Sequence, residues 1–214
     1  MQQLLNQELQ NQIKEFLSPM QKPITLVLFT KEGVCETCNE TKQLLKEVSA
    51  LNAKISLVEK DLNKDAADAK AYGVTMTPSF VILDDQGKYQ GVKFNGIPAG
   101  HEINSFLSAL LDMSGLDFGF QTDVIERIQK VKKPVNIKVF VTLGCPHCPG
   151  AVQNAHRLAI LNDNIEGEMI EAQTFGALSQ KFNVSGVPKI VINDEFELLG
   201  NQPVEAFLNY LDRL

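Results

Sequence analysis

The stretch that decides the fold is KPVNIKVFVTLGCPHCPGAV, residues 133–152. Its segment VNIKVFVT (135–142) is rich in β-branched and apolar residues, which is typical of a buried strand. The pair Cys145/Cys148 follows at once, and a helix is expected after Cys148. A C-x-x-C motif at a strand-to-helix junction of a β-α-β unit indicates a redox-active dithiol.

A second copy of this pattern lies earlier in the chain. The apolar segment ITLVLFT (24–30) precedes another C-x-x-C motif, which begins at Cys35. The sequence distance from Cys35 to Cys145 equals the distance from Pro78 to Pro188. Self-similarity at a fixed offset is the signature of a repeated structural unit.

The repeat predicts two units, residues 1–117 and residues 118–214. The segment SGLDFGF (114–120) breaks the pattern between them. Each unit follows a β-α-β then β-β-α order, so the predicted fold class is α/β, with a central mixed sheet of four or five strands in each unit, flanked by helices. The expected strands are 24–30, 54–62, 79–85 and 88–94, then 135–142, 165–172, 189–193 and 196–200. The expected helices are an amphipathic one within 1–20, then 38–50, a short one after the strand 54–62, 101–113, a linker helix that ends at the basic run of Lys130, Lys132 and Lys133, one beginning after Cys148, 175–182 and 204–214.

Composition limits the classes of function. The chain has 214 residues, 44% hydrophobic and 21% charged, which suits two packed domains. The formal net charge of -6 argues against nucleic-acid binding, which needs a clustered basic surface. No stretch is apolar enough to span a membrane, and the N-terminus lacks the basic and apolar regions of a signal peptide. We therefore expect no membrane association and a cytoplasmic location.

All four cysteines fall in the two C-x-x-C motifs. In a reducing compartment this pairing favours redox or metal chemistry over a static disulfide framework. Cys35 and Cys145 each precede a helix, whose free N–H groups and positive dipole end stabilise a thiolate, so we expect them to be the nucleophiles. Cys38 and Cys148, one turn further on, are expected to resolve the mixed disulfide.

The residues between the sulfurs make the two sites unequal. In the second motif Pro146 suits a first helical turn, and His147 can add positive charge or a hydrogen bond to the thiolate. In the first motif Glu36 places a negative charge beside the sulfur. We therefore predict that Cys145 is the principal nucleophile and that Cys35 belongs to the less acidic, more reducing site.

Three segments carry a resemblance to a known family. They are GIPAGHEINSFLSALLDMS (96–114), the stretch 133–152 and VSGVPKIVIN (184–193). With these segments the chain resembles the tandem protein disulfide oxidoreductases, or glutaredoxin-like domain proteins, of the thioredoxin superfamily. It is also similar to the N-terminal domain of alkyl hydroperoxide reductase flavoproteins, which usually lacks the first dithiol. The resemblance implies two tandem thioredoxin-like units.

The resemblance also implies site residues and partners. Pro78 and Pro188 are expected to be cis and to face the dithiols. Asp61 and Glu171 precede these two prolines by the same sequence distance, each on an expected central strand, and could assist proton transfer to the leaving thiolate. The resemblance favours Glu171, and the alternative is a strand-end carboxylate in water. No bound cofactor is required, and the expected partners are disulfide-bearing proteins and a thioredoxin-reductase-like flavoenzyme that uses NADPH.

Two alternatives stay open. The first is a dedicated electron donor to a peroxiredoxin, and the second is a non-catalytic module that binds thiols or a metal. A zinc ribbon places roughly 15–20 residues between its cysteine pairs. Here Cys38 and Cys145 are several times further apart and lie in different repeats, which favours dithiol chemistry over a shared metal site.

Overall fold

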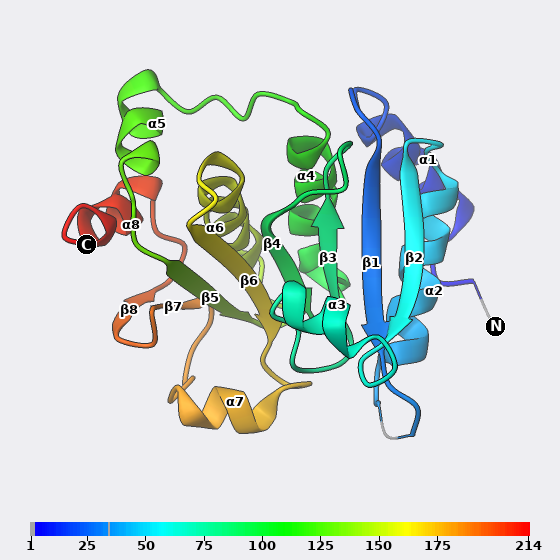
Figure 1. Cartoon of the computed structure of the whole chain (residues 1–214). Coiled ribbons are helices and arrows are strands. Elements are labelled where there is room, and N and C mark those ends of the chain that lie inside the picture. The colour runs from blue at the N-terminus through cyan, green and yellow to red at the C-terminus, as the bar shows by residue number, and fades with distance from the viewer. Residues whose placement is uncertain (1–2, 34) are drawn as a thin grey trace.

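The computed structural model describes residues 3–33 and 35–214 (Figure 1). The helices and strands lie close to the predicted positions, and β1 and α2 match their predicted ranges to the residue. In chain order the elements are α1 (Gln7–Phe16), β1 (Ile24–Thr30), α2 (Cys38–Ala50), β2 (Ile55–Asp61), α3 (Ala66–Ala71), β3 (Ser79–Leu83), β4 (Tyr89–Asn95), the 3-10 turn η1 (Gly100–Glu102), α4 (Ile103–Met113), α5 (Thr122–Gln129), β5 (Val135–Val141), α6 (Cys148–Leu161), β6 (Ile165–Glu171), α7 (Gly176–Lys181), β7 (Lys189–Ile192), β8 (Phe196–Leu199) and α8 (Val204–Leu211).

The strands form one eight-stranded sheet in the order β2-β1-β3-β4-β6-β5-β7-β8. Each repeat supplies four strands in the same internal order, so the predicted mixed α/β units are confirmed. β3 and β7 run antiparallel to both neighbours, and the other strands run in one direction. The two half-sheets are therefore continuous rather than separate.

The junction between the repeats is a parallel pairing of β4 with β6, from Val92 opposite Gly167 to Asn95 opposite Ile170. Glycine permits the close packing there. A Cβ on Gly91 in β4 would lie 2.4 Å from the carbonyl oxygen of Ile165 in β6. The junction thus depends on a backbone contact that leaves no room for a side chain.

Helices cover the two faces of the sheet unequally. Figure 1 shows α4 and α6 side by side on one face, and one continuous apolar core joins them to α2. On the opposite face, α3 and α7 each cover a small separate core near the ends of the parallel strands. Alternation along β1 produces this division, because Leu26 and Leu28 belong to the large core while Val27 and Phe29 belong to a small one.

Among the described residues, no helix combines the length and the hydropathy that crossing a membrane requires.

Candidate functional site

Each cysteine pair forms a disulfide at the start of a helix. Cys35 is bonded to Cys38 and Cys145 to Cys148, with Cα atoms 5.5 Å apart in both pairs. The second cysteine is the first residue of α2 or α6, and the first cysteine lies in the loop that leaves β1 or β5. Because β1 and β5 run in the same direction in one sheet, both dithiols lie at the same end of the sheet, where the carboxyl ends of these two strands meet the loops.

Within each pair the first cysteine is the more accessible. Cys145 is 8% exposed and Cys148 is 0% exposed. In the first repeat Cys35 is partly exposed and Cys38 is buried. This order suits an outer sulfur that meets the substrate and an inner sulfur that is protected until it resolves the mixed disulfide.

The residues around the two sites carry different charges. Glu36 precedes α2 and Glu40 lies in its first turn, and both are exposed. The first turn of α6 contains no acidic residue, and the exposed His147 occupies its N-cap position. An acid in the first turn interacts with the positive helix end that would otherwise favour a thiolate. The local charge therefore favours the thiolate at Cys145 over that at Cys35.

The two predicted prolines are cis, at the Thr77–Pro78 and Val187–Pro188 bonds. Each immediately precedes the strand that pairs antiparallel with the end of β1 or β5, which brings it to the dithiol end of the sheet. The carbonyl of Pro78 accepts the N–H of Gly96, and that of Pro188 accepts the N–H of Gly200. The cis-proline loop therefore has the same backbone hydrogen bond in both repeats.

The two predicted acids end the strands beside the dithiol-bearing ones. Asp61 lies opposite Thr30, the last residue of β1, and Glu171 lies opposite Val141, the last residue of β5. The expectation of a central strand is right for Glu171 but wrong for Asp61, because β2 is an edge strand. The difference arises because β6 gains a second neighbour, β4, from the other repeat.

Both carboxylates cap the turn that follows their strand. Asp61 accepts the backbone N–H groups of Asn63 and Lys64, at 2.9 and 3.0 Å, and these bonds lower the pKa of its carboxyl. Glu171, which is buried, accepts the N–H and the hydroxyl of Thr174, each at 2.7 Å. Each acid therefore has a clear structural role, and Glu171 is not in water.

Glu102 is a buried acid that the sequence reasoning missed. It is 0% exposed, burial raises the pKa of its carboxyl to about 7, and its Oε1 has no hydrogen-bond partner among the described residues. Its neighbour His101 donates a backbone N–H to the carbonyl of Leu143, two residues before Cys145. Helical spacing could have revealed it, because Phe106 lies one turn further along on the same buried face.

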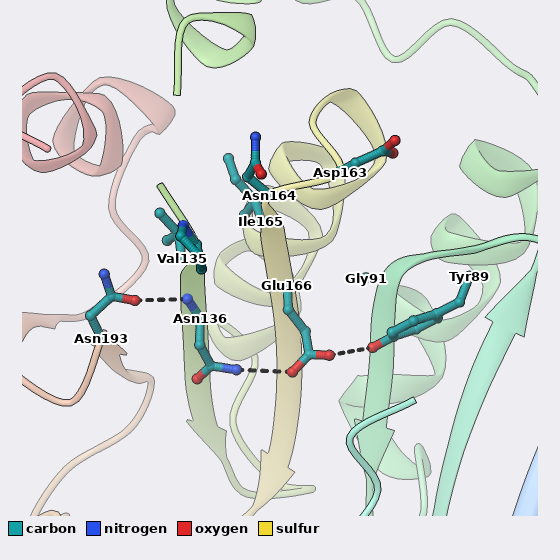
Figure 2. A pocket seen from close by; sticks show the side chains of 10 residues that line it. Tyr89, Gly91, Val135, Asn136, Asp163, Asn164, Ile165, Glu166 and Asn193 are labelled. Carbon is teal, nitrogen blue, oxygen red and sulfur yellow. Dashed lines mark hydrogen bonds between the residues drawn. The ribbon is translucent and has the colours of Figure 1, made fainter. Parts of the chain in front are cut away.

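A polar cavity of about 370 Å³ lies at the starts of β5 and β6, at the end of these strands opposite the dithiols, and Figure 2 shows the side chains that line it. Several of the polar residues that line the cavity form hydrogen bonds with one another. Asn193 Oδ1 accepts the N–H of Asn136, the Asn136 amide donates to Glu166, and the Tyr89 hydroxyl donates to the other oxygen of Glu166. We assign no ligand to this cavity.

A disulfide at the start of a helix, with a cis-proline at the same end of the sheet, occurs twice in one sheet and defines a tandem thioredoxin-fold protein with two dithiol centres. The chain belongs to the thioredoxin domain family, which matches residues 25–108 and 135–212. It is 31% identical over 208 residues to the alkyl hydroperoxide reductase AhpF of Staphylococcus aureus, a match that covers 97% of this chain and 38% of that protein.

Solved structures are similar over nearly the whole chain. The NTD_N/C domain of the alkyl hydroperoxide reductase AhpF of Enterococcus faecalis has a TM-score of 0.91 and 28% identity, covering 97% of this chain and 99% of that one. A protein disulfide oxidoreductase of Aeropyrum pernix has a TM-score of 0.89 and 27% identity, covering 97% and 92%. By family and fold the chain is thus a tandem thioredoxin-domain protein.

Proposed function

We propose that the chain performs thiol-disulfide exchange with proteins, and so reduces, forms or isomerises their disulfides through mixed-disulfide intermediates at its two dithiols. The observation that carries this proposal is the repeated pair itself: an accessible cysteine before a helix and a protected cysteine as its first residue, twice at one end of the sheet. The similarity to the protein disulfide oxidoreductase of Aeropyrum pernix supports it.

In the reductive direction the thiolate of Cys145 attacks one sulfur of the substrate disulfide, and the other substrate sulfur leaves as a thiolate and takes a proton. Cys148, as its thiolate, then attacks Cys145 in the mixed disulfide and releases the second substrate thiol. Two electrons pass to the substrate, and the Cys145–Cys148 disulfide remains. A thioredoxin-reductase-like flavoenzyme that uses NADPH would return it to the dithiol.

Several residues take supporting roles in the proposal. His147 stabilises the Cys145 thiolate from the N-cap of α6, while Pro78 and Pro188 contact the substrate chain. Glu171, which the family resemblance favours, is the proposed proton donor, whereas the carboxylate of Asp61 is held ionised by backbone N–H groups that lower its pKa. The repeats keep the boundaries 1–117 and 118–214, and the location is cytoplasmic.

The test is reduction of insulin disulfides by dithiothreitol, followed by the turbidity of the released B chain. The wild-type protein should accelerate the reaction catalytically, whereas a variant with all four cysteines changed to serine should match the uncatalysed rate. If the two proteins gave the same rate, the proposed function would be wrong.

A second candidate function is electron donation to a peroxiredoxin. It is favoured by the match to the alkyl hydroperoxide reductase of Staphylococcus aureus over 97% of this chain, although the chain spans only 38% of that relative's length. NADPH, a thioredoxin-reductase-like flavoenzyme, a peroxiredoxin and peroxide would be combined with and without the chain. NADPH oxidation that depends on both the chain and peroxide supports this candidate, and unchanged oxidation rejects it.

A further inference from the structure

An apolar groove opens beside the first dithiol. It has a volume of about 410 Å³ and is lined by Leu4, Leu5 and Leu9 near the N-terminus, and by residues of α2 and of the segment that follows β4. Among its described lining residues only Glu40, two residues after Cys38, is charged. Glu40 lies about half a helical turn after Cys38, so the groove begins close to the inner cysteine, and Leu4, which is 45% exposed, presents apolar surface in it.

The second repeat offers an internal comparison. At the offset that relates Cys35 to Cys145, the groove residues Glu40 and Leu44 correspond to Gly150 and Asn154. The segments that follow β4 and β8 correspond as well, because Gly96 and Gly200 each donate to a cis-proline carbonyl. The same position can therefore be compared in both repeats.

In the second repeat polar side chains fill this position. The Asn201 amide lies so close to Gly150 that a Cβ there would come within 2.4 Å of its nitrogen. The Asn154 amide donates to the carbonyl of Gln202 at 3.0 Å. Asn201 takes the place of Ile97, which lines the groove in the first repeat. The apolar groove is therefore a feature of the first dithiol and is closed at the second.

The rim of the groove carries the carboxylate of Glu40, and Glu36 precedes it in the chain just before α2. Glu36 and Glu40 lie four residues apart at the start of α2, both are exposed, and neither is in an ion pair with another described residue. Positive charge on an incoming chain would complement them. An apolar side chain of a bound polypeptide fits the apolar lining of the groove, and a cation next to that side chain complements the nearby carboxylates.

We propose that the groove binds an apolar side chain, next to a lysine or arginine, of a polypeptide whose disulfide is attacked by Cys35. This inference rests on the proposed function, because reaction with Cys35 brings the polypeptide to the groove. The Cys35 thiolate bonds to the polypeptide sulfur as the substrate disulfide breaks and its other sulfur leaves. Cys38 then bonds to Cys35 and frees the polypeptide thiol, so the dithiol is oxidised as the substrate is reduced.

The test uses two short peptides, each with its cysteine disulfide-bonded to thionitrobenzoate, whose coloured thiolate is the better leaving group. One peptide carries Leu-Lys before the cysteine, and the other carries Ser-Lys, so that the two peptides have the same charge and differ only in the apolar side chain. The protein contains only the first dithiol, through Cys145→Ser and Cys148→Ser, and is reduced with dithiothreitol and desalted before mixing. The initial rate of thionitrobenzoate release is measured by stopped flow.

We expect the Leu-Lys peptide to react about tenfold faster, which corresponds to burial of one apolar side chain. Ile97→Asn, which copies the second repeat, and Leu4→Asn should each reduce this ratio to below about twofold. Leu199→Asn is the control, because Leu199 is an apolar side chain exposed on β8, outside the groove. It should keep the full ratio. A protein with only the second dithiol should show a ratio near one.

Equal rates for the two peptides at the first dithiol would overturn the inference, as would a ratio that survives both Ile97→Asn and Leu4→Asn. Either result leaves the proposed function standing if insulin reduction still depends on the cysteines. Failure of insulin reduction, in contrast, overturns the proposed function itself.

Discussion

At the scale of single residues, the two dithiols share a backbone geometry but differ in their charged neighbours. A thiol with the reference pKa near 8.5 is only about 3% ionised at pH 7, so small changes in local charge alter the amount of nucleophile strongly. Glu36 and Glu40 lie at the start of α2, whereas His147 occupies the N-cap position of α6. Burial acts in the opposite sense, because it disfavours the charged thiolate and Cys145 is more buried than Cys35. Neither cysteine is fully exposed.

The first prediction concerns which cysteine leads. Cys145→Ser should lower insulin reduction to below about a tenth of the wild-type rate, while Cys35→Ser should keep at least about half, because the thiolate forms more readily at the second site. Both rates are measured per mole of protein, with circular dichroism as the control for folding. Full activity after Cys145→Ser would contradict the prediction.

The second prediction concerns Glu102. The native state raises the pKa of this carboxyl from 4.5 to about 7, so the folded protein binds its proton more tightly than the unfolded chain does. The free energy of unfolding should therefore decrease as the pH rises from about 4.5 to about 7, by roughly 3 kcal/mol in total.

Glu102→Gln should remove this contribution, so that stability depends less on pH. Urea unfolding at pH 5 and pH 8 measures the difference for each protein. Glu8→Gln, at an exposed position in α1, is the control and should keep the wild-type difference. The same pH dependence in wild type and Glu102→Gln would show that another group is responsible.

The cysteines and prolines were predictable because their motifs are local and repeated. The turn contacts of Asp61 and Glu171 were not, because they depend on backbone N–H groups whose direction is set only when the turn forms. The position of Glu102 was only partly predictable from the sequence. Its helical spacing from Phe106 points to the core, but an acid in such a position is ordinarily assigned to the surface.

At the scale of helices and strands, apolar periodicity located most elements because their buried faces follow the regular periods of strands and helices. One element was missed. The sequence predicts a single helix from His101, whereas the structure has η1 over Gly100–Glu102 before α4. The cause is tertiary: Gly100 has φ +58, and its backbone lies against Leu143 of the other repeat.

The third prediction tests this contact. In Gly100→Ala the new Cβ would lie 2.3 Å from the Leu143 carbonyl oxygen, in a left-handed conformation. The substitution should lower the free energy of unfolding by about 3 kcal/mol, through backbone strain and overpacking together. Gly87→Ala is the matched control, since φ is +72 there and nothing lies within 4 Å. It should lower stability by only about 1 kcal/mol, as measured by urea unfolding, and equal effects would contradict the prediction.

At the scale of the whole molecule, the repeats share one sheet, and the sequence does not reveal which strands pair between the repeats. β4 and β6 belong to different repeats, and strand pairing at such distance has no local signal. Lys93 illustrates the difficulty, because a lysine in an alternating strand is ordinarily solvent-facing, yet it is 1% exposed. It donates to Glu166 across the junction at 3.0 Å, and Glu168 lies 3.9 Å away.

The fourth prediction is that this ion pair joins the repeats energetically. Lys93→Met should lower the free energy of unfolding by about 3 kcal/mol, because it leaves the carboxylate of Glu168, 8% exposed, without its nearest cation. Lys88→Met is the matched control. It also removes a cation that forms an ion pair between the repeats, with Asp163, but both partners are exposed, so the loss should stay below about 1 kcal/mol.

Urea unfolding followed by circular dichroism should give a single transition for the wild type, because neither half-sheet is complete at the junction without the other. Two separate transitions in the wild type, or equal effects of the two substitutions, would show that the repeats are only loosely joined at β4 and β6.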